Sequence, residues 1–324
     1  MSRFYYGGQA VIEGVMMRGK TSVAVAMRKP DQSIYVYEEA LPPRLYRGKL
    51  FRLPFLRGML LLWETLILGT RIMTLSANVA SEEPEDEAKA PSADAPAQEV
   101  DEDKTKIGAS MALSLITSMT IAVAVFFVGP LVVTSLLRTW IGDGWLSLVL
   151  EGILRLALLI GYLLLIGRVP DIQRVFGYHG AEHKAINAME HGEPLDVAHV
   201  RAATRVHTRC GTGFLLIVAV LSIAIFALVV TPSLPIKIIS RVVLVPVVAA
   251  VAYELMRLGA ANYRFRIVRW LLAPGLALQG LTTREPEDGM IECSIAALER
   301  VLARDQDAES GKQDASAASL AVAP

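Results

Sequence analysis

Four long blocks of apolar residues constrain the fold of this chain more than any other feature. They run from Ile107 to Leu137, from Leu146 to Ile166, from Gly213 to Val230 and from Leu234 to Leu258. The hydrocarbon core of a bilayer is about 30 Å thick, and a helix needs roughly 20 apolar residues to cross it. With 53% hydrophobic residues, the chain is too apolar for an ordinary soluble protein. We therefore predict a mainly α fold, a polytopic α-helical membrane protein with a small cytoplasmic α+β portion.

The short connections between these blocks predict two transmembrane hairpins, over residues 107–166 and 213–258. Residues 138–145 and 231–235 leave room only for tight turns. The first block is longer than one straight crossing requires. Either Gly129-Pro130 kinks this block, because proline removes a helical hydrogen bond, or part of the block projects from the bilayer.

The positions of lysine and arginine predict the orientation of the hairpins. The first 58 residues contain ten of these side chains, and the segment from Arg168 to Arg209 contains six. Short basic segments are retained on the cytoplasmic side of a membrane. We therefore expect cytoplasmic termini and three cytoplasmic regions, which are residues 1–53, the histidine-rich loop 167–212 and residues 259–303.

Two segments lack the apolar residues that a core requires. Residues 81–106 are rich in Ala, Pro and acids, and residues 304–324 have a similar composition. We predict a disordered acidic linker and a disordered tail. Residues 81–103 hold ten acids and one base, so the rest of this formally neutral chain carries +9. We interpret that charge as a topology signal and expect no specific nucleic acid partner.

Residues 54–80 predict an amphipathic helix. Arg57, Glu64, Arg71 and Asn78 recur every seven residues and form a narrow polar stripe on an apolar run. A crossing at this point would put the basic histidine-rich loop outside the cell, so we favour a helix at the interface or packed on the bundle. If residues 107–137 contained an extra crossing, residues 54–80 could cross the membrane and the histidine-rich loop would still be cytoplasmic. Upstream, Ser22–Met27 and Ile34–Tyr37 predict a β-hairpin.

All five histidines fall within one short window, which Cys210 closes. His179 and His183 are four residues apart, so on a helix they share one face, with Glu182 beside the second. His207 and Cys210 follow with a two-residue spacer. Imidazole and thiolate are ligands that Zn²⁺ prefers, so His179, His183, His207 and Cys210 are the predicted metal ligands. His191 and His199 are interpreted as surface residues.

The spacing of His179, Glu182 and His183 matches the HxxEH pattern of inverzincin metalloproteases, in which the glutamate activates water. Glu182 is therefore the predicted catalytic residue. Four ligands would make a closed structural site, whereas three ligands would leave a position for catalysis. The alternative to a metal site is a set of histidines that form hydrogen bonds at the membrane surface.

Several further charged residues are candidates for supporting roles. Charges inside a membrane are costly, which draws attention to Glu151, Arg155 and Glu254. The first two could form an ion pair that locks helices together, and Glu254 could reach the histidines as a ligand or hydrogen-bond partner. Glu13 and Arg18 lie in a glycine-rich opening run, and Lys184 follows His183. Cys293 is expected to be a buried thiol.

These motifs resemble the YqhQ-type family of uncharacterised bacterial multipass membrane proteins, which are described as predicted metal-dependent enzymes. The resemblance rests on GGQAVIEGVMMRG at 7–19, FGYHGAEHK at 176–184, the run from His207 to Phe214 and PGLALQGLTTREP at 274–286. Arg57-Gly58, Glu151-Gly152, Arg155 and Tyr253-Glu254 match as well. Thr208 departs from the proline that is usual in the family. The resemblance implies a metal site facing the cytoplasm, the bacterial inner membrane as the location, and a link to membrane-protein biogenesis.

Three functions fit these features. The first is a metal-dependent hydrolase with a divalent ion, Zn²⁺ by its ligands, and Glu182 as the general base. The second is a non-catalytic assembly or biogenesis factor with a structural metal. The third is a transporter that uses Glu151, Arg155 and Glu254. The expected partners are the lipid bilayer, other membrane or translation-linked proteins and further copies of the chain.

Overall fold

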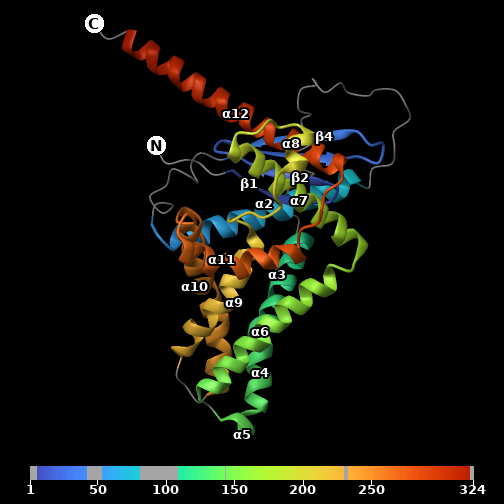
Figure 1. The fold of residues 1–324 in the computed structure, drawn as a ribbon. Coiled ribbons are helices and arrows are strands. Elements are labelled where there is room, and N and C mark those ends of the chain that lie inside the picture. The colour runs from blue at the N-terminus through green and yellow to red at the C-terminus, as the bar shows by residue number, and fades with distance from the viewer. Residues whose placement is uncertain (1–5, 42–52, 81–108, 143, 230–232, 322–324) are drawn as a thin grey trace.

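The computed structural model describes residues 6–41, 53–80, 109–142, 144–229 and 233–321. Over these ranges the chain is mainly helical and carries a four-stranded sheet. Figure 1 shows a head that contains the sheet and an elongated bundle of helices that extends away from it. The predicted linker at 81–106 lies outside the described residues.

The sheet is an antiparallel meander in the order β1 (Gly7–Val11), β2 (Gly14–Arg18), β3 (Ser22–Arg28) and β4 (Ile34–Ala40). Strands β3 and β4 confirm the predicted hairpin, with Val25 opposite Tyr37. The glycine-rich opening run supplies β1 and β2. Its turn places Glu13 at a φ of 51°, in the left-handed region.

Side chains alternate between the two faces of the sheet, and helices cover both faces. On one face, Ala10, Val15 and Met17 pack with residues of α7 (Pro170–His191) and α12 (Asp288–Ala321). On the other face, Val11 and Met16 pack against α2 (Leu56–Ala80). Cys293 of α12 is fully buried in the core on the α7 and α12 side of the sheet, as expected. Burial raises the pKa of its thiol to about 11.

The polar stripe of α2 is paired with its neighbours. Arg57 contacts Glu254 of α10 (Leu234–Ala261), Glu64 contacts Arg18 of β2, and Arg71 contacts Glu39 of β4. Three charged residues of this helix therefore form ion pairs with the sheet and with one bundle helix. Figure 1 shows α2 lying beneath the sheet, across the direction of the bundle.

The bundle contains α3 (Ala109–Val123), η3 (Ala124–Val128), α4 (Gly129–Leu136), α5 (Arg138–Ile141), α6 (Trp145–Ile166), α9 (Gly211–Ala227) and α10. Four helices of the described chain are long and apolar enough to cross a membrane, namely Leu56–Ala80, Ala112–Leu136, Trp145–Ile166 and Leu234–Ala261. This set differs from the predicted one. It includes α2, whereas α9 ends at Ala227 and is a shorter apolar helix of 17 residues.

Near the predicted kink the chain forms a π-helical turn, η3, which ends at Val128, two residues before Pro130. The N–H of Gly129 donates to the carbonyl of Ala124, five residues earlier. Pro130 has no N–H to donate to the carbonyl of Phe126, four residues before it. Arg155 of α6 donates to that carbonyl instead, with Nε 3.0 Å from the oxygen. Pro130 therefore leaves a backbone acceptor for a buried arginine.

Two segments are more helical than the sequence led us to expect. The predicted loop 167–212 consists largely of α7 and α8 (Val197–Ala202). Pro170 begins α7, and Gly192 ends it with a φ of 76°, the left-handed conformation typical of helix ends. The predicted tail continues α12 as helix to Ala321, because its alanines favour helix. Helix α11 (Arg266–Leu278) and η4 (Gln279–Leu281) link α10 to α12.

Candidate metal centre

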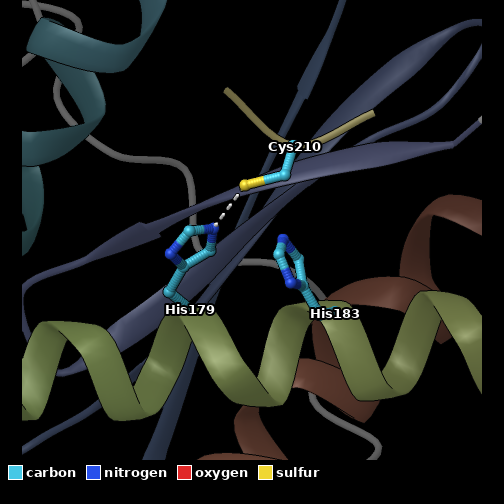
Figure 2. A group of neighbouring side chains, drawn as sticks. All are labelled: His179, His183 and Cys210. Carbon is cyan, nitrogen blue, oxygen red and sulfur yellow. Dashed lines mark hydrogen bonds between the residues drawn. The ribbon is translucent and has the colours of Figure 1, made fainter. Parts of the chain in front are cut away.

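Three of the predicted ligands converge between α7 and the start of α9. His179 and His183 lie on one face of α7, with ring centroids 4.4 Å apart. Cys210 caps α9, and its Sγ lies 3.4 Å from Nε2 of His179. One donor atom from each residue lies within 4.8 Å of the other two. Figure 2 shows both rings rising from α7 towards the sulfur.

Backbone carbonyls fix the orientation of both histidines. Nδ1 of His179 lies 2.8 Å from the Thr282 carbonyl, and Nδ1 of His183 lies 2.5 Å from the Arg205 carbonyl. A carbonyl can only accept, so Nδ1 carries the proton in each neutral ring. Each Nε2 therefore carries a lone pair that a metal could use, and that of His179 faces Sγ of Cys210, which can donate to it. A second hydrogen bond at Nδ1 is normal for metal-binding histidines.

The carboxylate of Glu182 lies beside both rings and is buried. Its Oε2 is 3.6 Å from Nε2 of His183 and 4.0 Å from Nε2 of His179. Strand β1 covers this side chain at Gly8, where a Cβ atom would come within 2.7 Å of Cγ of Glu182. Glycine is therefore required at position 8 for the strand to approach the site so closely.

The fourth predicted ligand, His207, is adjacent to the group but outside it. Its ring centroid lies 5.6 Å from that of His183, and its Nε2 is buried without a hydrogen bond. Gln279 holds the backbone of His207 through both its N–H and its carbonyl. Glu190 approaches Nε2 at 3.8 Å. Burial raises the pKa of Glu190, but His207 and Arg209 outweigh that effect and lower it to about 2.

Four other predicted charged residues, in the head and on α10, hold elements together. Lys184 donates to the Arg201 carbonyl and pairs with Glu285, each at 2.6 Å. Glu13 accepts two hydrogen bonds from Arg174, which lower the pKa of Glu13. Arg18 and Glu254 pair with α2, as described above. None of these four predicted side chains belongs to the three-residue donor group of the described chain.

The predicted pair of Glu151 and Arg155 is part of a buried triad. Arg155 Nη2 lies 2.9 Å from Glu151, and Arg241 of α10 reaches both oxygens of the same carboxylate, at 3.0 and 3.1 Å. All three side chains are almost fully buried. Arg241 was overlooked, although an arginine within an apolar block is itself a signal. The triad joins α6 to α10, which supports the interpretation as a helix lock.

The segment after α11 also has a role that the sequence analysis missed. The motif PGLALQGLTTREP carried the family resemblance and was assigned no role at the site, yet it supplies Gln279 and the Thr282 carbonyl to it. The Oγ1 atoms of Thr282 and Thr212 are 2.8 Å apart, which ties this segment to α9. The buried polar run Gln279, Thr282 and Thr283 was the available signal.

Substitution of Gly180 by alanine is expected to disturb the site without touching a donor atom. A Cβ at this position would lie 2.1 Å from the carbonyl oxygen of Arg284, so the segment that holds His179 must move. We expect a loss of about 1–3 kcal/mol in stability, typical of overpacking. Thermal melting would measure it. Gly211→Ala is the control, because a Cβ there meets nothing within 4 Å; an equal effect in both variants would contradict the argument.

The chain belongs to the family described as "Protein of unknown function (DUF1385)", whose model matches residues 53–304. It is similar to "Uncharacterized protein YqhQ" of Bacillus subtilis (strain 168), with 35% identity over 305 residues that cover 92% of each chain. The resemblance inferred from the motifs is thereby confirmed. No solved structure matches the chain.

Proposed function

We propose that this chain is an integral membrane protein whose head lies on the cytoplasmic side. Two helical hairpins, α3–α4 with α6 and α9 with α10, would each return the chain to the side on which it entered. That arrangement keeps the sheet, α7 and α12 together. The lysines and arginines of the first 58 residues and of residues 168–209 favour the cytoplasm for this side.

In this proposal α2 rests at the interface and does not cross, although it is long and apolar enough to do so. Its buried Ile72 and Leu75 pack on the sheet, and its charges pair with residues of the sheet and α10. A crossing would carry the sheet-packing end of the helix through the bilayer. The short helix α9 crosses beside α10, against which it packs.

We further propose that the head binds a zinc-like divalent metal ion. The observation that carries this proposal is the convergence of three donor atoms within 4.8 Å, with both histidines oriented by carbonyls. Two imidazoles and one thiolate form a ligand set typical of zinc. Three protein ligands leave a fourth position open, as in catalytic sites.

The function that this arrangement supports best is metal-dependent hydrolysis. A zinc ion held in this way would lower the pKa of a water molecule and polarise the bond to be cleaved. Glu182 is placed to accept a proton from the attacking water, because its carboxylate faces both Nε2 atoms. The Glu182 side chain is buried, which limits the access of bulk water to that carboxylate.

A second candidate is a structural metal in an assembly factor. The observation that favours it is the buried Nε2 of His207, which forms no hydrogen bond and lies close to His183. In this candidate the His207 ring turns from Glu190 towards the group, supplies a fourth ligand and closes the site. A closed site has no position for a substrate.

Elemental analysis of purified protein tests the metal proposal and separates its two forms. We expect one metal ion per chain in the wild type and its loss in His183→Ala and Cys210→Ser. His207→Ala is expected to retain the metal if the site is open. The matched control is His191→Ala on the same helix, whose Nδ1 bonds to the Asn187 carbonyl. Loss of metal in His207→Ala would favour the structural form, and a metal-free wild type would refute the proposal.

A further inference from the structure

An apolar cavity of about 710 Å³ lies between α9, α10 and α11 and reaches the candidate metal centre. We propose that it binds the acyl chain of an anionic membrane phospholipid, which makes such lipids the substrate class of the centre. The inference rests on the proposed function, because it assigns a ligand to the same site. Its volume lies within the range of about 300–1,000 Å³ that is typical of small-molecule sites.

The lining of the cavity is suited to a hydrocarbon chain. Leu216 and Ile217 of α9, Leu255 of α10 and Leu272 of α11 contribute to walls that are apolar over most of their area. Leu258, Ile267 and Leu271 line the cavity and are also 58–75% exposed. The cavity therefore opens sideways from the bundle, towards the position of the bilayer in the proposed orientation.

The lining of the cavity includes polar residues next to the donor group. Thr208, Cys210 and Gln279 line it there, and Cys210 is one of the three converging donors. A lipid with its chain between the helices would therefore have its glycerol end near the sulfur. This continuity between an apolar channel and a candidate metal ligand argues for a substrate pocket rather than a packing defect.

The charge around the cavity favours an anionic head group. Arg264, Arg266 and Arg269 are exposed and alternate with the lining residues Phe265, Ile267 and Val268. The sequence contains no acidic residue between Glu254 and Glu285. Trp270 of α11 is 84% exposed. Exposed tryptophan side chains are typical of the bilayer surface. Guanidinium groups bind phosphate through charge-assisted hydrogen bonds.

Photocrosslinking in lipid nanodiscs tests this inference. The probe is a phosphatidylglycerol with a diazirine on one acyl chain, and labelled peptides are mapped by mass spectrometry. We expect labelling to concentrate on α9, α10 and α11 in the wild type and to fall at least fivefold in Ile217→Trp, which fills the cavity. Leu215→Trp is the matched control, since Leu215 is exposed on the same helix but does not line the cavity.

A phosphatidylcholine probe with the same chain tests the head-group part, and we expect severalfold weaker labelling. Equal labelling of all exposed bundle helices, or of Ile217→Trp and Leu215→Trp, would overturn the proposal, as would equal labelling by the two probes. Metal content is measured on the same preparations. Specific labelling without metal would refute the metal proposal alone, and metal without specific labelling would refute the lipid proposal alone.

Discussion

Replacement of Glu151 by glutamine is expected to destabilise the protein by about 3–5 kcal/mol, the usual effect of removing one partner from a buried ion pair. The carboxylate of Glu151 is shared by Arg155 and Arg241, so its loss leaves two buried guanidinium groups without a counter-charge. The Phe126 carbonyl and Ser222 hydroxyl would still accept from Arg155, but neither carries charge. We expect the variant to accumulate poorly in membranes and to melt at a much lower temperature in detergent.

Arg155→Leu provides the graded comparison for this prediction. It leaves the two-point contact between Arg241 and Glu151 in place, and leucine suits the apolar surroundings. We therefore expect a smaller loss of stability than in Glu151→Gln. Thermal melting of the two purified variants beside the wild type gives the order. If Arg155→Leu melted below Glu151→Gln, the carboxylate would not be the centre of the lock.

Most of the individual elements could be predicted from the sequence, because local patterns determine them. Alternating apolar residues predicted the hairpin of β3 and β4, and the long apolar blocks predicted the bundle helices. The seven-residue stripe of α2 was visible, but its partners were not. Arg18, Glu39 and Glu254 lie on three separate elements, and only the fold brings them to this helix.

The donor group shows where sequence reasoning ends. The spacing of His179 and His183 places them on one helical face, so their proximity follows from the helix alone. The choice between Cys210 and His207 does not, because it depends on how Gln279 holds the loop before α9. The carbonyls of Thr282 and Arg205 could not be predicted either, since every residue has a carbonyl and only tertiary structure selects two of them.

Glu182→Gln is expected to abolish the proposed hydrolysis while the metal is retained. Glutamine keeps the size of the side chain under Gly8, and the three donor residues are unchanged. An amide cannot accept the proton of the attacking water. Loss of a general base typically lowers the rate by about 10²- to 10⁴-fold, and we expect a decrease of about this order here. Complementation of a strain that lacks the gene gives the functional readout, beside elemental analysis of each variant. Glu193→Gln, an exposed change just after α7, is the matched control.

The comparison of Glu182→Gln with His183→Ala distinguishes a catalytic metal site from a structural one. In a catalytic site both variants fail to complement, but only His183→Ala loses the metal, because Glu182 handles the proton and His183 holds the ion. In a structural site Glu182→Gln complements fully, since the fold needs the donors and not the carboxylate. Full complementation by Glu182→Gln with failure of His183→Ala would therefore eliminate the hydrolase and leave the assembly factor, whose closed site would then require His207 as the fourth ligand.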